Sequence, residues 1–459
     1  MSVLTQTRAS STPADQTRTR PDLAVDHIVL QSVAQHMYAL MLRNVATDGF
    51  PFVDSTHTAV SVPGCVIAAP SYPANAPGIS QDYVFNWVRD AAITAFEIVA
   101  ATSSGPEEAV QELVDYVNFA QLCQSNATPT MGHACYTVNG YARPWSEQND
   151  GPAIQTSAVL AAFPKLDAQA QDVARGLVGR NVEYLLTCYQ DATTNLWEEH
   201  RGFSFFARSI QLRCFREVST NPYGIDVPAG TAEAISWLED ALAAHWTGTH
   251  YATMLGGESP GQLDQPIVPP GYDPNIDIVQ ACVYGAVSCT DPKLLATAGL
   301  LIAQWADPDS PEVYPVNVAD AQLGLGPLLG RYPGDIYDGG SDSLGRHPWP
   351  LCTANFAQLY YELANAITGG SALPLDDLSA PFFAQIGVTA DTPLDVAVEA
   401  LQVAGDAMLR AVVYHSDHLE LSEQFDGESG YEKSVRDLTW SYASFLSAVR
   451  ARTGLAVEG

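Results

Sequence analysis

Apolar residues recur every three to four positions through most of the 459-residue chain, and this spacing predicts a largely helical protein. Within residues 24–45, for example, Leu30, Val33, Met37 and Leu40 would share one face of a helix. Similar patterns predict helices at residues 88–101, 107–123, 153–163, 169–190, 204–217, 229–253, 290–305, 349–368, 394–414 and 433–452, with one more near 318–329. The signal for strands is weak by comparison.

Long loops rich in glycine, proline, asparagine and aspartate separate many of these predicted helices. They cover residues 51–86, 124–152, 254–289, 306–317, 331–348 and 415–432, and they hold most of the tryptophans, arginines and paired acids. Loops of this length inside a compact domain are usually functional or disordered. About twelve helices spaced in this way predict helical hairpins arranged in a ring, with the loops gathered over one end.

A single domain is expected over residues 25–459, because no internal repeat and no low-complexity linker interrupts the chain. Residues 1–24 are polar and contain arginines but no apolar segment, so we expect a disordered tail there. Such a tail does not resemble a secretory signal peptide. A cytoplasmic location is therefore favoured, and secretion stays open for a chain whose leader has been removed.

The strongly acidic composition limits the partners of the chain. Its 52 acidic and 21 basic residues leave a formal net charge of −31. Nucleic acids and anionic membranes are therefore not expected as partners, whereas a neutral substrate or a cation meets no such repulsion. No run of apolar residues is long enough to predict a membrane span.

Eight scattered cysteines do not form a CxxC pair, so a zinc site is not expected. Most of them lie in apolar stretches, which is typical of buried thiols. Cys282 and Cys289 would close a short loop as a disulfide in an exported protein. No cofactor is predicted.

The stretch NLWEEHRG, residues 195–202, places Glu198 and Glu199 directly after Trp197. Adjacent side chains on a helix or strand point in different directions, so two neighbouring carboxylates rarely serve one solvated surface. An indole beside them indicates partial burial, which raises the pKa of a carboxyl group and makes it a possible proton donor. The alternative is a polar turn.

Four further loops concentrate aromatic and charged residues in the same way. They read QDYVFNWVRDAA from residue 81, NGYARPWSEQNDGPA from 139, GRYPGDIYDGGSDSLGRHPWPLC from 330 and LELSEQFDGESGYEKSVRDLTWSY from 419. Tyr141 and Arg143 suit sugar contact, because rings stack on the apolar faces of sugars while charged groups bind hydroxyls. Asp338 and Asp342 could bind calcium, or they could belong to a flexible polar loop. Their irregular spacing favours the flexible loop.

Taken in this order, the five stretches resemble the catalytic domain of the fungal-like glucoamylases, glycoside hydrolase family 15. The matching segments here are AAPSYPANAPGISQDYVFNWVRD, LWEEHRGFSFF, GRYPGD with HPWPLCT, and SEQFDGESGYEKSVRDLTWSYA. The resemblance covers roughly residues 25–453. It implies an all-α fold, an (α/α)6 barrel of about twelve helices.

The resemblance also implies roles for individual residues. Glu198 would be the general acid and Glu423 the general base, while Arg89 and Asp90 would hold the hydroxyls of the terminal glucose. Trp197 would help to keep the carboxyl group of Glu198 protonated. Further substrate contacts would come from Tyr83, Trp87, Tyr141, Leu196, Trp197, Glu199, Arg331, Tyr332, Trp349 and Trp440, with Tyr83 near the hydrolytic water.

The chain departs from the family pattern around the sugar beyond the first. Tyr141 stands where a tryptophan is usual, the segment WSEQ lengthens the same loop, Asn195 replaces an aspartate and Gly334 a glutamate. The loop from Asp338 to His347 is also longer than usual. These changes leave the preferred linkage and chain length open.

The expected activity is that of an inverting, exo-acting glucan α-glucohydrolase that releases β-glucose from the non-reducing ends of α-1,4 or α-1,6 gluco-oligosaccharides. A hydrolase specific for isomaltose or trehalose and a catalytically silent sugar-binding barrel are the alternatives. The chain shows no Ser/Thr-rich linker or starch-binding domain, which favours short soluble substrates. A monomer is expected.

Overall fold

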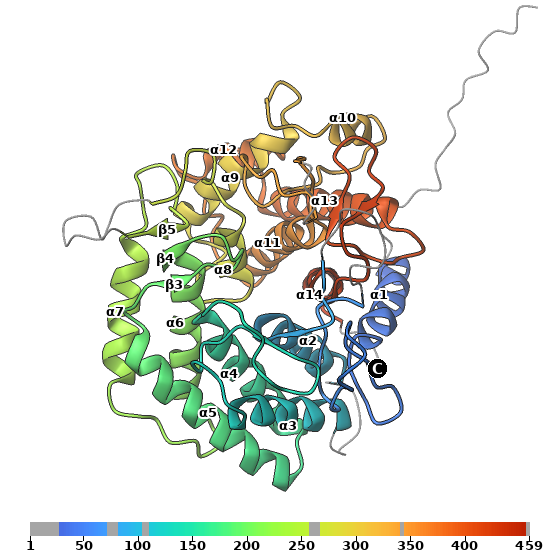
Figure 1. Ribbon diagram of the computed structural model, residues 1–459. Coiled ribbons are helices and arrows are strands. Elements are labelled where there is room, and N and C mark those ends of the chain that lie inside the picture. Colours follow the sequence, from blue (N-terminus) through green and yellow to red (C-terminus); the bar gives the residue numbers. More distant parts are fainter. Residues whose placement is uncertain (1–26, 71–80, 103–109, 257–266, 340–343, 456–459) are drawn as a thin grey trace, which may run out of the picture.

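Six helices form a closed inner ring in the computed structural model of the chain (Figure 1). The structure describes residues 27–70, 81–102, 110–256, 267–339 and 344–455. The inner helices are α2 (Val88–Ala101), α4 (Asp150–Ala162), α6 (Phe205–Ser219), α8 (Asp277–Val283), α11 (Pro350–Thr368) and α14 (Thr439–Thr453). Each packs against the next, and α14 closes the ring by packing against α2.

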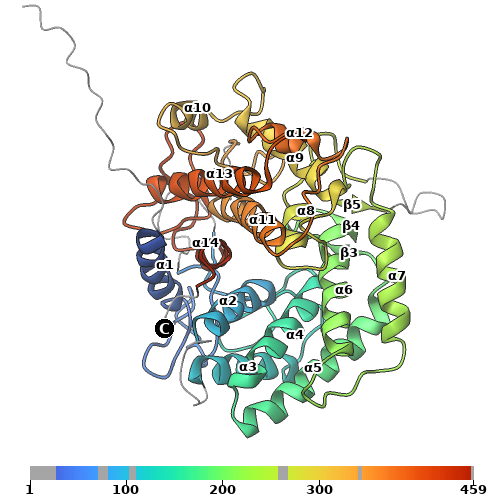
Figure 2. The same cartoon turned by 180° about the vertical axis from the view of Figure 1, so that it is seen from behind.

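An outer layer of helices surrounds this ring (Figure 2). It contains α1 (His27–Leu42), α3 (Gln111–Ser125), α5 (Ala168–Cys188), α7 (Thr231–Ala243), α9 (Pro292–Ala306) and α13 (Leu394–His415). Outer helices pack on inner ones, for example α5 on α4, α7 on α6 and α13 on α11. The short helices α10 (Pro315–Ala321) and α12 (Ala380–Ala384) lie outside both layers. The predicted (α/α)6 barrel is confirmed.

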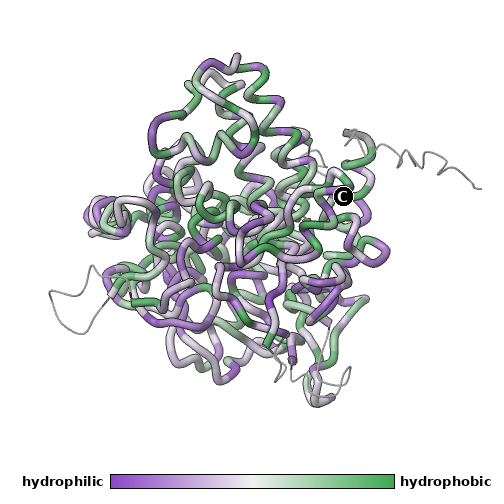
Figure 3. Tube along the Cα trace, turned by 90° about the horizontal axis from the view of Figure 1, so that it is seen from above, coloured by the Kyte–Doolittle hydropathy of each residue, from purple (hydrophilic) through white to green (hydrophobic). Residues whose placement is uncertain are grey.

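The inner helices are buried on all sides, whereas the outer helices are buried only on the side that faces the inner ring. In α4, twelve of the thirteen residues are buried, as expected of a helix that is covered on all sides. In α13 the buried residues Ala397, Leu401, Met408 and Val412 follow one stripe that faces the inner ring. Figure 3 shows hydrophobic and hydrophilic residues alternating along the trace of the chain.

Short antiparallel strands hold the loops at one end of the barrel. Strand β1 (Asn86–Trp87) pairs with β2 (Cys135–Tyr136) and leads into α2. Strand β4 (Arg201–Ser204) pairs with both β3 (Thr193–Thr194) and β5 (Met254–Leu255) and leads into α6. Strands β6 (Gln424–Phe425) and β7 (Glu432–Lys433) form a hairpin before α14. The loops are thereby fixed near the N-terminal ends of inner helices.

The predicted helices match the structure except at a few boundaries. The predicted helix 318–329 is wrong beyond Ala321, because Gly324 adopts a left-handed conformation (φ +69°) and Gly326 lies against the backbone of α13. The predicted helices 229–253 and 433–452 are too long, since α7 ends at Ala243 and α14 begins at Thr439. Helix α8 was not predicted, because seven residues are too few to show a period.

The eight cysteines are all free thiols, and Cys282 and Cys289 do not form the disulfide considered for an exported protein. Seven of the eight are buried, as the sequence predicted. None of the described helices is long and apolar enough to cross a bilayer. The predicted tail, residues 1–24, lies outside the described residues.

Candidate active site

A pocket of about 350 Å³ opens among the loops before the inner helices. Twelve of the predicted site residues line it: Tyr83, Trp87, Arg89, Asp90, Leu196, Trp197, Glu198, Glu199, Arg331, Trp349, Glu423 and Trp440. Trp87 and Trp349 are the residues directly before α2 and α11. The barrel therefore brings together side chains from loops that lie far apart in the sequence.

Glu198 lies in a tight turn organised by the buried side chain of Asn195. The side-chain oxygen of Asn195 accepts the backbone N–H groups of Glu199 (3.0 Å) and His200 (3.1 Å). The backbone N–H of Glu198 donates to the carbonyl of Asn195 (3.0 Å). Glu198 has a φ of +65°, an uncommon conformation for a residue with a Cβ that costs conformational energy. In this conformation the Glu198 side chain lines the pocket.

Three N–H groups converge on a single oxygen of Glu198. The indole of Trp87 (3.0 Å), the indole of Trp145 (2.8 Å) and the side-chain amide of Gln148 (2.6 Å) all donate to Oε1. The amide of Gln148 is oriented because its oxygen accepts Nη1 of Arg89 (2.7 Å). Among the described residues, Oε2 of Glu198 accepts no hydrogen bond. One oxygen is therefore held by the protein while the other remains open to a ligand.

Glu423 is buried at the other side of the pocket and is held by three donors. The hydroxyl of Tyr83 donates to Oε1 (2.7 Å), while Gln81 (3.2 Å) and the hydroxyl of Ser434 donate to Oε2. Burial raises the pKa of Glu423 above the usual range, and the hydrogen bonds from Ser434 and Tyr83 and the charge of Arg331 oppose this rise.

Arg89 and Asp90 lie at the start of α2, and both line the pocket. Arg89 is held by Asp150 (Nη1 to Oδ2, 2.9 Å) and by the carbonyl of Leu196 (Nη2 to O, 2.9 Å). Burial raises the pKa of Asp90 to about 7, although the charge of Arg89 opposes this effect. When Glu198 is ionised, its charge raises the pKa of Asp90 further.

Glu199 points to different partners from Glu198. Its carboxylate accepts the hydroxyls of Tyr272 (2.7 Å) and Tyr332 (2.9 Å) and pairs with Nη2 of Arg331 (3.0 Å). Arg331 also forms two hydrogen bonds of 2.7 Å with Asp335. Tyr332 does not line the pocket, and its hydroxyl holds the carboxylate of Glu199 in place. The two adjacent glutamates thus belong to separate hydrogen-bond networks.

Comparison with known proteins assigns this barrel and its pocket to a family. The model of glycosyl hydrolases family 15 matches residues 40–219 and 229–450 of this chain. The chain belongs to glycosyl hydrolase family 15. It is 26% identical to glucoamylase 1 of Rhizopus oryzae over 81% of this chain, and 26% identical to a probable glucoamylase of Schizosaccharomyces pombe over 90%. The match spans 65% of the Rhizopus protein and 89% of the Schizosaccharomyces protein.

Solved glucoamylase structures share the fold of this family 15 chain. The glucoamylase of Hormoconis resinae superposes with a TM-score of 0.78 at 21% identity, covering 93% of this chain and 74% of that one. The glucoamylase of Saccharomycopsis fibuligera gives a TM-score of 0.77 at 22% identity, covering 94% and 96%.

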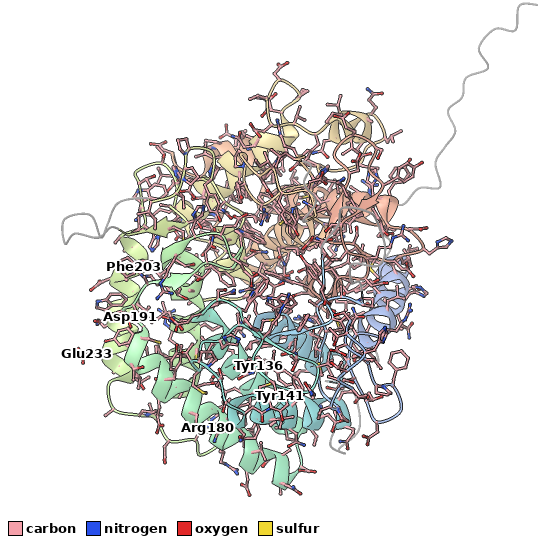
Figure 4. All side chains as sticks on the ribbon, in the orientation of Figure 1. Tyr136, Tyr141, Arg180, Asp191, Phe203 and Glu233 are labelled. Atoms are coloured by element: carbon pink, nitrogen blue, oxygen red, sulfur yellow. The ribbon has the colours of Figure 1, made fainter. Side chains whose placement is uncertain are left out.

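The structure of the family 15 chain does not bring Tyr141 into the pocket. Its side chain is 56% exposed on the loop after β2, near Tyr136 in Figure 4. The inserted segment WSEQ moves the contact along the loop, so that Trp145 lines the pocket instead. The insertion is visible in the sequence, but no local pattern indicates that it supplies the indole.

Trp197 lines the pocket together with Glu198, and its indole N–H bonds to another partner. Its ring stacks on Trp440 (centroids 6.1 Å apart), and its N–H donates to the side chain of Asn275 (3.0 Å). The indoles that bond to Glu198 are those of Trp87 and Trp145. The effect of Trp197 on the protonation of Glu198 stays a prediction.

Several polar residues that support the site were not predicted from the sequence, namely Gln81, Gln148, Asp150, Tyr272, Asp335 and Ser434. Gln148 and Asp150 follow Trp145 in the motif NGYARPWSEQNDGPA, in which only Tyr141 and Arg143 had been given a role. The calcium hypothesis finds no support at Asp338, which pairs with Lys433 (2.7 Å) and His347 (3.2 Å). Asp342 lies outside the described residues. Within the described part of the chain, no group of three His, Cys, Asp or Glu side chains could hold a metal ion.

Proposed function

We propose that this family 15 chain is an inverting, exo-acting glucan α-glucohydrolase. In this reaction Glu198 donates a proton to the glycosidic oxygen and Glu423 activates water on the opposite face of the sugar. The observation that carries the proposal is that both carboxyl groups line one pocket while their surroundings differ. A carboxyl pair in distinct environments is the arrangement that separates an acid from a base.

The hydrogen bonds at Glu198 indicate which of its two oxygens would carry the proton of a general acid. Since Oε1 accepts three N–H groups, a proton on Glu198 resides on Oε2, the oxygen that is open to the pocket. After proton transfer, the same three donors stabilise the carboxylate that remains.

The surroundings of Glu423 favour the role of the base. Its two oxygens accept hydrogen bonds from Tyr83, Gln81 and Ser434, which stabilise the ionised form, as does the charge of Arg331. Its burial makes the carboxylate a stronger proton acceptor than an exposed glutamate. Together these groups suit abstraction of a proton from water.

The pocket fits the end of a neutral sugar chain better than its middle. A volume of about 350 Å³ is at the small end of ligand pockets. Asp90 and Glu199 offer carboxylate oxygens to sugar hydroxyls, and the rings of Trp87, Trp145 and Trp440 offer stacking surfaces. We therefore propose β-glucose as product and short α-1,4 and α-1,6 gluco-oligosaccharides as substrates.

The first test is the anomer released. Proton NMR of the early reaction with maltoheptaose should show β-glucose before mutarotation, and early α-glucose would refute inversion. A panel of maltose, isomaltose, trehalose and maltoheptaose separates the proposal from a disaccharide-specific hydrolase. Absence of turnover on all four would favour the silent barrel.

The second test removes each carboxyl group in turn. Glu198→Gln and Glu423→Gln should each lower kcat by about a hundredfold or more, because general acid and base catalysis contribute at least that much. Glu239→Gln, at an exposed ion pair with Arg216, is the matched control and should retain wild-type activity. Near-normal activity of either site variant would reject its assigned role.

A further inference from the structure

A second cavity of about 500 Å³ lies between the C-terminal end of α13 and the β6–β7 hairpin. Its walls include Tyr414, His415, Asp417, Tyr431, Glu432 and Arg436. No residue lines both this cavity and the active-site pocket. The two sites are nevertheless linked, because Glu423 directly precedes β6 and Glu432 begins β7.

The floor of this cavity is well defined. His415 bonds through Nε2 to Asp320 of α10 (2.7 Å), which fixes the imidazole ring. Gly430 has a φ of +76°, and a Cβ at this position would lie 2.3 Å from Nδ1 of His415. The hairpin can therefore approach the histidine only because residue 430 is a glycine.

Two exposed tyrosines form the walls. Tyr431 is 78% exposed and Tyr414 is 48% exposed, although aromatic side chains usually bury much of their surface. Beside them, Arg436 lies 3.9 Å from both Asp417 and Glu432. Aromatic faces next to carboxylates and a guanidinium group match the apolar faces and hydroxyl edges of a sugar.

Charge narrows the choice of ligand. Asp417 and Glu432 outnumber Arg436, and the whole chain carries a net charge of −31, so an anionic ligand would be repelled. We propose that this cavity is a second carbohydrate-binding site, which holds a neutral α-glucan chain near the catalytic pocket. The choice of an α-glucan among neutral polysaccharides rests on the proposed function. Such a site would raise the local concentration of chain ends at the pocket.

Binding of β-cyclodextrin tests the site independently of catalysis, because this cyclic α-1,4-glucan has no chain end. Titration calorimetry should show binding to the wild type and an affinity about tenfold weaker in Tyr414→Ala and Tyr431→Ala. KM for soluble starch should rise in both variants, while kcat/KM for maltose should not change. Phe50→Ala, which removes another exposed aromatic ring (53% exposed), is the matched control and should bind as the wild type does.

The outcomes separate the two proposals. Unchanged cyclodextrin affinity in both tyrosine variants would overturn the second site, and so would an equal loss in Phe50→Ala. Tyrosine-dependent binding of a β-glucan in place of cyclodextrin would overturn the choice of ligand. Cyclodextrin binding by a wild-type protein that hydrolyses no glucan would refute the proposed function and leave the second site standing.

Discussion

At the scale of single residues, the environment of each carboxyl group distinguishes it from its neighbours. Glu198 and Glu199 are adjacent, yet Glu198 accepts two indoles and an amide while Glu199 accepts two tyrosines and pairs with Arg331. The left-handed turn at Glu198 produces this divergence. A residue's partners, and not its type, therefore decide which glutamate we expect to donate a proton.

Replacing Ser434 should change the pH dependence of activity. Its hydroxyl donates to Glu423 and lowers the pKa of that carboxyl group against the effect of burial, so its removal raises the pKa further. A base must be ionised, so activity is lost as the pH falls through its pKa. In Ser434→Ala the acidic limb of kcat/KM should therefore move to higher pH.

The control for this experiment is Ser441→Ala, whose hydroxyl donates to a backbone carbonyl (Ser422, 2.9 Å). Its acidic limb should match that of the wild type. An unshifted limb in Ser434→Ala would contradict the assignment of Glu423 as the base.

Trp145 and Tyr141 provide a direct comparison of structure with sequence. Trp145→Phe keeps an aromatic ring but removes the N–H that donates to Glu198, so kcat should fall about tenfold or more. Tyr141→Phe should leave kcat and KM unchanged, since this ring lies outside the pocket. Steady-state kinetics with maltose measure both effects. A larger loss in Tyr141→Phe would support the position predicted from the family pattern.

At the scale of elements, the N-terminal ends of inner helices organise the pocket. Trp87, Trp349 and Leu438 line it, and they directly precede α2, α11 and α14. Buried helices are rigid supports, whereas the loops before them are free to vary. This arrangement explains how an inserted segment such as WSEQ changes a contact without changing the barrel.

Two glycine substitutions should have opposite effects on stability. A Cβ at Gly326 would lie 2.6 Å from the backbone nitrogen of Met408 in α13, so Gly326→Ala should destabilise the protein by about 1–3 kcal/mol. At Gly179, within α5, a Cβ meets no atom within 4 Å, so Gly179→Ala should stabilise it by about 0.5–1 kcal/mol. Thermal unfolding followed by circular dichroism measures both. Shifts of the same sign would contradict this explanation of where α10 ends.

At the scale of the whole molecule, the ring closes between the two ends of the chain. The side chain of Asn44, after α1, donates to the carbonyl of Asp437 (2.8 Å) and to the hydroxyl of Thr439 (2.7 Å). The N–H of Thr439 donates to the carbonyl of Ala68 (2.8 Å). These bonds join the beginning of α14 to the N-terminal part, so residues 25–459 should unfold as one domain.

Asn44→Ala should lower the stability of the whole barrel. The loss leaves buried polar groups without their partner and should cost about 1–3 kcal/mol. We expect a single transition, shifted by a few degrees, that coincides in tryptophan fluorescence and far-UV circular dichroism. Asn139→Ala removes only a local contact with Thr137 (2.7 Å) and serves as the control. Two separate transitions in the wild type would contradict the single domain.

The sequence by itself determined the helical hairpins, their approximate bounds and the loops that supply the pocket, because burial imposes a local period on each helix. Of the fourteen site residues predicted from the loop motifs, twelve line the pocket, since these motifs are specific when taken together. Only the tertiary structure decided that Trp145 and not Tyr141 reaches Glu198, and that Trp197 stacks on Trp440. These contacts depend on the paths of the loops and on partners that are distant in the sequence. The helical spacing of apolar residues therefore carries no information about them.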